Sequence, residues 1–154
     1  MPLILGADEW SRIEQGLVQR ADLLEALLAD IYGPQTLLEK GLIPPDLVHS
    51  SPAFLPYARG VQPPGGRYLV STGCDLIRTA GGAWSVMRDH ASVPGGLGQT
   101  FENRNVISNL LSEPFEAMRV ARLGAFIDVE RATLQSFSSS RREQANVVFL
   151  TPGF

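Results

Sequence analysis

Residues that could do chemistry are concentrated in one polar stretch, RDHASVPGGLGQTFENR, at positions 88–104. An acid and an imidazole, Asp89 and His90, precede a Pro-Gly-Gly turn, and a Glu-Asn-Arg triplet follows it. Carboxylate oxygens bind Mg²⁺, glycine lets the backbone approach a phosphate, and arginine pairs with phosphate or carboxylate. The stretch therefore has residue types suited to binding a metal and a phosphate group.

A second acid, Asp75, lies in a segment that the sequence predicts as a β-strand. Residues 74–79 and 83–88 carry β-branched and aromatic side chains and flank the sequence Ala-Gly-Gly, which is typical of a hairpin. A two-residue Gly-Gly turn places Asp75 opposite Arg88, and it places Asp89 on the other face of the hairpin unless a bulge intervenes.

The carboxylates of Asp75 and Asp89 are the predicted metal ligands. Two acids on one face of neighbouring strands could hold Mg²⁺ together with nucleotide phosphates. The structural alternative is a cross-strand ion pair between Asp75 and Arg88, which contributes roughly 0.2–1 kcal/mol. Spacing alone leaves both interpretations open.

The glycine turn and the triplet after it are the predicted nucleotide-binding residues. Backbone amides at Gly95 and Gly96 could approach a phosphate, although the sequence is no Walker A motif and a plain turn would look the same. Glu102, Asn103 and Arg104 come early in a predicted helix. Arginine there could pair with phosphate, and the alternative is an ordinary exposed helix start.

The histidines and the cysteine give weaker signals. His49 and His90 are too few and too far apart to indicate a zinc site, so structural or solvent-facing roles are expected. Cys74 is the only cysteine, and burial beside a carboxylate would raise its thiol pKa. A small hydrolase using Cys74 or His90 is the weakest interpretation, because no nucleophile and base are paired.

The remaining pattern predicts the elements that position these residues. Apolar residues at three- and four-residue steps indicate an amphipathic helix over residues 7–32, with a possible bend near Gly16. Gly33 and the proline after it end that helix, because glycine tolerates the left-handed conformation. Further predicted elements are helical turns at 36–39 and 45–48, an extended loop at 51–66, a strand at 67–71, helices within 101–111 and 120–134, a polar connector at 136–144 and a buried strand at 146–150.

Composition and length bound the class of protein. The chain has 154 residues, 44% of them hydrophobic and 19% charged, which predicts a single α+β domain over residues 1–154 with N-terminal helices packed on a small, mainly antiparallel sheet. A net charge of −3 gives no support for a nucleic-acid or membrane partner. One cysteine, no signal-peptide pattern and no run of about 20 apolar residues predict a cytoplasmic protein.

Four separated motifs, taken in order, resemble the circularly permuted ATP-grasp family. They are LLADIYGPQTLLEKGLIPPDLV at 27–48, CDLIRTAGGAWSVMRDHASVPGG at 74–96, FENRNV at 101–106 and VVFLTPG at 147–153. The resemblance covers nearly the whole chain and includes a distinctive Asp-Ile-Tyr-Gly helix end.

The resemblance implies a partial ATP-grasp-like architecture and ATP and Mg²⁺ as cofactors. ATP-grasp proteins generally join a carboxylate to an amine or thiol through an acyl-phosphate, and Mg²⁺ neutralises phosphate charge during such transfers. Asp75 and the segment at 88–90 then look like the metal-bearing strands. The complete enzyme would act on a small molecule or a peptide.

The chain departs from the family pattern at three places. Arg88, Asp89 and His90 stand where many relatives have Glu-Asp-Asn, so only Asp89 matches. Glycine replaces serine at Gly95, and a tyrosine common before the triplet is replaced around Gln99. Relatives also continue well past the Leu-Thr-Pro-Gly motif.

These observations predict the N-terminal part of an ATP- and Mg²⁺-dependent carboxylate–amine ligase that is inactive alone. Its expected partner is the C-terminal ATP-grasp portion or a second copy of the chain. The alternative is a non-enzymatic interaction module derived from an ATP-grasp protein, because the apolar segment at 147–150 offers a strand edge for pairing.

Overall fold

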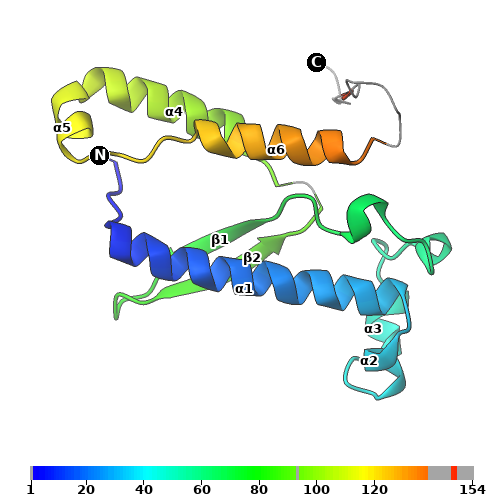
Figure 1. Cartoon of the computed structure of the whole chain (residues 1–154). Coiled ribbons are helices and arrows are strands. Elements are labelled where there is room, and N and C mark those ends of the chain that lie inside the picture. Colours follow the sequence, from blue (N-terminus) through cyan, green and yellow to red (C-terminus); the bar gives the residue numbers. More distant parts are fainter. Residues whose placement is uncertain (1, 93, 139–146, 149–154) are drawn as a thin grey trace.

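The structure is a computed structural model that describes residues 2–92, 94–138 and 147–148. Its described elements are mixed α+β, as predicted, and comprise six α-helices and one two-stranded antiparallel sheet (Figure 1). The long first helix and the hairpin lie below the last three helices in this view. The elements are α1 (Ala7–Tyr32), α2 (Thr36–Glu39), α3 (Pro45–His49), β1 (Gly73–Arg78), β2 (Trp84–His90), α4 (Leu97–Leu110), α5 (Ser112–Ala117) and α6 (Gly124–Ser136).

Helix α1 spans the predicted residues and runs through Gly16 as one helix. Acidic residues Asp8 and Glu9 occupy its first turn, where they interact favourably with the positive end of the helix dipole. Ile13 is buried, with 8% of its surface exposed. The apolar spacing that predicts this helix also places Ile13 on the face that packs against the hairpin.

Helix α1 ends at the Asp-Ile-Tyr-Gly sequence, as predicted, but Gly33 does not adopt the left-handed conformation that was expected of it. Gly33 has a negative φ of −106°, and the left-handed residue is Gln35, with φ 59°. Glycine is required at position 33 because an added Cβ would lie 2.5 Å from the carbonyl oxygen of Ala29. The Asp30 carboxylate accepts hydrogen bonds from the backbone amides of Thr36 and Leu37, at 2.9 and 3.0 Å, and so caps α2.

An aromatic stack fastens the loop after α3 to the end of α1. The Tyr32 ring stacks on Phe54 and Tyr68, with centroid separations of 5.5 and 5.9 Å. The Glu25 carboxylate accepts the backbone amides of Tyr68 and Leu69, both at 2.8 Å. The prediction of a strand at 67–71 is therefore wrong: amides that a neighbouring strand would bond are taken by a helix side chain.

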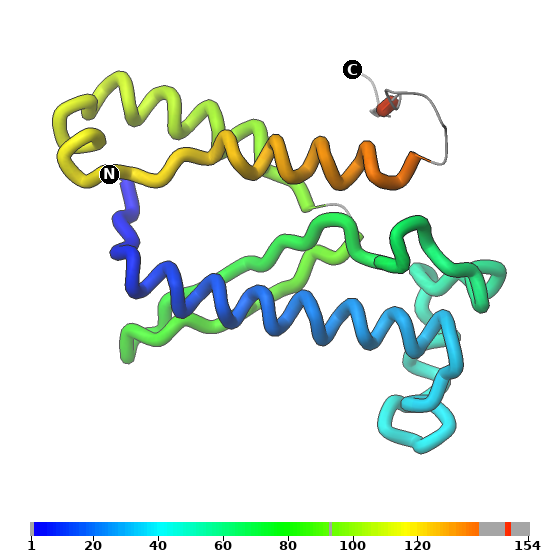
Figure 2. The backbone as a smooth tube through the Cα atoms, in the orientation of Figure 1, coloured from blue at the N-terminus to red at the C-terminus, as the bar shows by residue number. Residues whose placement is uncertain are grey.

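The loop at 51–66 contains two short 3-10 turns, Pro56–Ala58 and Pro64–Gly66, and otherwise has no regular helix or strand, as the prolines and glycines predict. From this loop the backbone enters β1, reverses, and returns along β2 to the start of α4 (Figure 2).

The hairpin turn has three residues rather than the predicted two. The Thr79 amide donates to the Ala83 carbonyl at 2.8 Å, and the Gly82 amide donates to the Thr79 carbonyl at 2.9 Å. Gly82 has φ 82°, so the turn ends on a left-handed residue, as three-residue hairpin loops do. This extra residue shifts the pairing of the two strands by one position.

A β-bulge then restores the predicted pairing at the far end of the hairpin. Leu76 pairs with Val86 and Asp75 pairs with Arg88, so Met87 is left unpaired between them. The prediction that Asp75 faces Arg88 is confirmed, although it depends on two irregularities that the sequence pattern did not predict.

The apolar pattern correctly predicted helices in the C-terminal part of the chain, but their first residues differ from the predicted ones. Helix α4 covers the predicted helix within 101–111 and begins four residues earlier, at Leu97. The second predicted helix, within 120–134, is α6, which begins only at Gly124, and the short α5 before it was not predicted. Most of the predicted strand at 146–150 and most of the connector at 136–144 lie outside the described residues. The described part of that strand, Val147 and Val148, is in neither a helix nor a strand.

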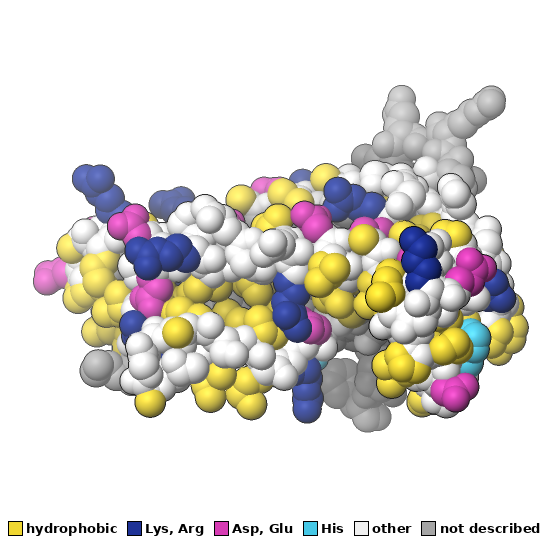
Figure 3. Space-filling view, turned by 90° about the horizontal axis from the view of Figure 1, so that it is seen from below, with side chains coloured by type: hydrophobic (Ala, Val, Ile, Leu, Met, Phe, Trp, Pro, Cys, Tyr) yellow, Lys and Arg dark blue, Asp and Glu magenta, His cyan; other side chains and the backbone are white. Residues whose placement is uncertain are grey.

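The molecule is open. The chain exposes 12683 Å² of surface, whereas a compact monomer of this mass exposes about 7,600 Å². Among the described residues, only Ile13, Leu38 and Val48 are buried hydrophobic side chains. Figure 3 shows apolar side chains spread over the face seen from below. No helix in the described part of the chain is long and apolar enough to span a bilayer.

Candidate functional site

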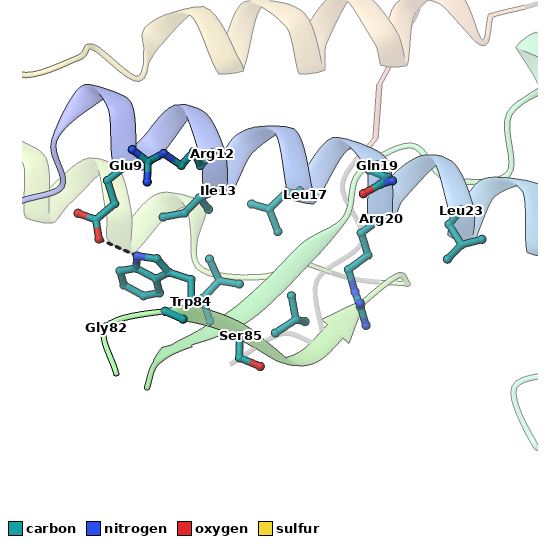
Figure 4. Close-up of a pocket in the computed structure, with 14 residues that line it drawn as sticks. Glu9, Arg12, Ile13, Leu17, Gln19, Arg20, Leu23, Gly82, Trp84 and Ser85 are labelled. Carbon is teal, nitrogen blue, oxygen red and sulfur yellow. Dashed lines mark hydrogen bonds between the residues drawn. The ribbon is translucent and has the colours of Figure 1, made fainter. Parts of the chain in front are cut away.

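Two polar contacts hold α1 against the inner face of the hairpin. Near the start of α1, the Glu9 carboxylate accepts a hydrogen bond from the Trp84 indole at 2.8 Å (Figure 4). The same carboxylate lies 3.1 Å from the Arg78 guanidinium. Three helical turns later, Arg20 donates two hydrogen bonds to Asp89, each of 2.6 Å. These contacts fix the helix at both ends of the hairpin.

An apolar groove lies between the two contacts. Its volume is about 770 Å³, and the residues that line it come from α1, β1, β2 and the hairpin turn (Figure 4). Its apolar lining residues include Ile13, Leu17, Leu76, Trp84 and Val86. Apolar side chains at i and i+4 of α1 thus face alternate residues of the strands, as the periods of helix and strand require.

Asp89 lies on this inner face and is fully engaged there. Arg20 occupies both of its carboxylate oxygens, and the Cys74 thiol donates to Oδ1 over 3.3 Å. The hydrogen bonds from Arg20 lower the pKa of Asp89 below its usual value. Asp89 therefore acts in this structure as the anchor of α1.

Cys74 has the unreactive environment that its sequence context predicts. Burial raises the pKa of the Cys74 thiol, and the hydrogen bond to Asp89 raises it further. A raised pKa leaves less of the thiolate, which is the nucleophilic form. The structure gives no support for a nucleophile at this position.

Asp75 lies on the outer face with His90. The Nε2 atom of His90 is 3.0 Å from Oδ2 of Asp75, and the two side chains are 36% and 59% exposed. Arg88 is directly opposite Asp75 in the ladder but makes no ion pair with any described residue. The expected Asp75–Arg88 ion pair is thus replaced by a contact with the next residue on the same face.

The two predicted metal ligands consequently point away from each other. Cys74 pairs with Asp89, and Asp75 pairs with Arg88, so successive pairs place the carboxylates on opposite faces of the hairpin. The bulge comes before both pairs and does not bring the acids together. No group of three His, Cys, Asp or Glu side chains suited to a metal occurs among the described residues. Metal binding at Asp75 and Asp89 stays a prediction.

The glycine turn lies on the same outer face as Asp75. A Cβ placed on Gly73 would lie 3.3 Å from Cβ of Pro94 and 3.8 Å from Cβ of His90. Gly73 and Asp75 are two residues apart in β1 and so lie on the same face of the strand. The start of the turn, at Pro94, therefore packs beside the Asp75–His90 pair. No described atom lies within 4 Å of a Cβ placed on Gly95, so a ligand could approach the backbone from that side.

Helix α4 begins at this turn. Gly96 precedes it with φ 98°, and no side chain caps the helix start. Thr100 donates both its amide and its hydroxyl to the Gly96 carbonyl, each at 2.9 Å, which fixes the first turn. Among the described residues, no side chain caps the first backbone amides of α4, so these amides could bind an anion.

The predicted Glu-Asn-Arg triplet lies in the second turn of α4. The Arg104 guanidinium lies 5.9 Å from the centroid of the Phe115 ring in α5, a cation–π contact, and Arg104 is half-buried. Glu102 and Asn103 are exposed. Nucleotide binding by these three residues and by Gly95 and Gly96 stays a prediction.

The two histidines have different surroundings. The His49 ring lies 5.4 Å from the Phe54 ring and belongs to the aromatic cluster, in keeping with the structural role expected for it. His90 contacts Asp75 on the outer face, a contact that was not predicted. Its position two residues after Arg88, which faces Asp75, was the available signal, because residues at i and i+2 of a strand share a face.

Comparisons with known proteins identify the family of this chain. Residues 2–154 match the sequence model described as circularly permuted ATP-grasp type 2. An uncharacterized protein of Synechocystis is 35% identical over 153 residues, which is 99% of this chain and 32% of that protein. An uncharacterized protein of Mycobacterium tuberculosis is 33% identical over 153 residues, and this chain spans 17% of its length. An uncharacterized protein of Mycobacterium leprae is 35% identical over 153 residues, and this chain spans 27% of its length.

Proposed function

This chain belongs to the circularly permuted ATP-grasp family, type 2, over residues 2–154, and we propose that it supplies part of the nucleotide and metal site of an ATP- and Mg²⁺-dependent carboxylate–amine ligase. The observation that carries the proposal is the shared outer face of Asp75 and the glycine turn that leads into α4. An exposed acid beside open backbone amides suits a metal-bound phosphate.

The residues of the outer face fit such a ligand in part. Mg²⁺ is commonly bound by one or two carboxylates together with substrate phosphates, and Asp75 offers one exposed carboxylate. The amides at Gly95, at Gly96 and at the uncapped start of α4 would hold phosphate oxygens. Asp89 would bind a metal only after Arg20 leaves it. When bound, Mg²⁺ would neutralise charge on the transferred phosphoryl group.

The rest of the ligase site would come from elsewhere. The chain spans about a third of the Synechocystis relative and less of the mycobacterial ones, so residues 1–154 form one domain-sized part in this proposal. Among the described residues, the outer face offers one carboxylate, one imidazole and the guanidinium of Arg88, but no group of three side chains suited to a metal. We therefore expect this chain to bind Mg²⁺-ATP without forming a product on its own.

Isothermal titration of the chain with ATP, with and without Mg²⁺, tests the proposal. Wild type should give heat with Mg²⁺-ATP, and Asp75→Asn should lose it because the exposed carboxylate is gone. Asp22→Asn is the matched control, since Asp22 is an exposed acid on α1. No heat at millimolar Mg²⁺-ATP would remove nucleotide binding from this chain.

A second candidate function is that of an interaction module, and the open surface favours it. The exposed area exceeds that of a compact monomer by about two thirds. The hairpin is also only two strands wide in the described part of the chain, and such a ribbon is marginally stable alone. In this alternative, a second copy or the C-terminal ATP-grasp portion covers these faces.

Sedimentation velocity over a range of protein concentrations distinguishes the two candidates. Concentration-dependent association without Mg²⁺-ATP binding would favour the interaction module. A monomer at high concentration that binds Mg²⁺-ATP would favour the ligase part.

A further inference from the structure

One side of α1 is uncovered along the mouth of the groove. Arg12, Gly16, Gln19 and Leu23 follow one another at steps of three and four residues, so they form one stripe along the helix, which we call the α1 stripe. All four residues are exposed, and all four line the groove. Leu23 projects from α1 toward the same side as Arg20 (Figure 4). The α1 stripe therefore offers a surface to a second molecule.

The α1 stripe carries both an apolar projection and a space that could receive one. Leu23 is 67% exposed. No described atom lies within 4 Å of a Cβ placed on Gly16, which comes two helical turns earlier. The groove beside Gly16 has a volume of about 770 Å³ and a largely apolar lining, and protein interiors rarely leave such a space unfilled. The stripe thus presents a leucine at one end and an apolar hollow large enough for a leucine toward the other.

We propose that the chain forms a symmetric dimer in which two α1 helices pack antiparallel along their stripes. In an antiparallel pair centred near Leu17, position 12 of one helix lies opposite position 22 of the other. Leu23 of each copy then enters the groove of the other copy between Arg12 and Gly16, because helical side chains lean toward the N-terminus of their own helix. Each contact occurs twice, since the arrangement is symmetric.

The charges near the two ends of the stripe complement each other in this arrangement. Arg12 and the exposed acid Asp22 form no ion pair with any described residue. Antiparallel packing places Arg12 of each copy beside Asp22 of the other copy, whereas parallel packing would place like charges together. The two reciprocal ion pairs therefore specify the antiparallel orientation.

The chain exposes more surface than such a dimer requires. Its exposed area of 12683 Å² is about 5,000 Å² above that of a compact monomer of this mass. A standard stable interface takes about 800 Å² from each partner. A second copy is the occupant that the stripe favours, because the stripe and its flank supply both the leucine and the hollow, and both the arginine and the acid.

The dimer goes beyond the proposed function and leaves the proposed ligand face free. The groove lies on the inner face of the hairpin, whereas Asp75 and the glycine turn lie on the outer face. Each copy therefore keeps an accessible outer face. The dimer also gives the interaction-module candidate a definite surface and a definite partner.

Sedimentation velocity over a range of protein concentrations, without nucleotide, tests the dimer. Wild type should change from monomer to dimer as the concentration rises. Arg12→Asp and Asp22→Arg should each weaken association about tenfold, because like charges then face each other at both ends of the stripe. An equimolar mixture of these two variants should associate as wild type does, since opposite charges again meet at both ends of the mixed dimer.

Two further variants separate the apolar contact from the charges. Leu23→Gln should weaken association because it removes the apolar side chain that enters the groove. Glu14→Arg is the matched control, since Glu14 is an exposed acid on the side of α1 away from the stripe, and it should associate as wild type does. Circular dichroism of each variant verifies that the helices are retained.

A wild-type chain that stays monomeric at all concentrations would overturn the proposal and leave the groove to another occupant, such as the C-terminal ATP-grasp portion. Association that Arg12→Asp and Asp22→Arg leave unchanged, or that their mixture does not restore, would equally refute the antiparallel contact. Because nucleotide is absent, these results are independent of the Mg²⁺-ATP titration that tests the ligase proposal.

Discussion

The same substitution at two glycines of one helix should change the stability of the chain in opposite directions. Gly33 ends α1, and Gly16 lies in its middle. A Cβ at position 33 would lie 2.5 Å from the Ala29 carbonyl oxygen, whereas a Cβ at position 16 would meet nothing within 4 Å. Gly33→Ala should destabilise the chain, and Gly16→Ala should stabilise it.

The magnitudes follow from those contacts. Real Cβ atoms do not approach within 3.0 Å, and the Ala29 oxygen belongs to the helix backbone, so the end of the helix must move. Forcing an extra group into a filled site typically costs about 1–3 kcal/mol. Replacing a glycine inside a helix by alanine gains roughly 0.5–1 kcal/mol, because the unfolded chain loses conformational freedom.

Urea unfolding of both variants and wild type, followed by far-ultraviolet circular dichroism, measures the two changes. The Gly33→Ala transition should occur at lower urea and the Gly16→Ala transition at higher urea than that of wild type. Because Tyr32 precedes Gly33, movement there should also disturb the Tyr32–Tyr68 stack and the near-ultraviolet spectrum. Equal shifts of the same sign in both variants would refute the steric explanation of the helix end.

Two further predictions concern Asp89, which binds Arg20 of α1, and Asp30, which caps α2. The hydrogen bonds from Arg20 lower the pKa of Asp89 from its usual value of 3.8. The ionised carboxylate therefore stabilises the fold fully above that value, and this stabilisation is lost as the pH falls through the lower pKa of the folded state. The difference in unfolding free energy between wild type and Asp89→Asn should shrink between pH 6 and pH 2 when urea unfolding is measured at each pH, and a constant difference would contradict this linkage. Removing the cap of α2 in Asp30→Ala should cost about 0.5–2 kcal/mol in the same assay, and an unchanged midpoint would mean that water replaces the carboxylate.

The helical part of the fold follows closely from the sequence, because its determinants are local. The bounds of α1 were predicted from apolar residues at helical spacing, and α2 and α3 from short patterns after it. The predicted strand at 67–71 failed for a non-local reason: Glu25, more than 40 residues away, bonds its amides. Residue types alone do not show which partner a backbone amide will find.

The sequence predicted which residues belong to the candidate site better than it predicted how they are arranged in space. Asp75, Asp89 and the glycine turn were identified from residue type, and the resemblance to the ATP-grasp family brought them together. Which carboxylate lies with which partner depends on register, and the register depends on the turn length and the bulge. Arg20 was not identified as the partner of Asp89, because contacts between a helix and a distant strand leave no periodic signal in the sequence.

Met87 has a larger effect than its exposed side chain suggests. If Met87 were paired instead of bulged, the three-residue turn would place Met87 opposite Asp75, and Asp89 would lie diagonally beside Asp75 in the place now held by His90. The bulge thus places a carboxylate and an imidazole together on the outer face, instead of two carboxylates, and it leaves Asp89 on the inner face, where it binds Arg20. A shift of the strand pairing by one position is therefore enough to change which ionisable residues share a face, with no change in the sequence.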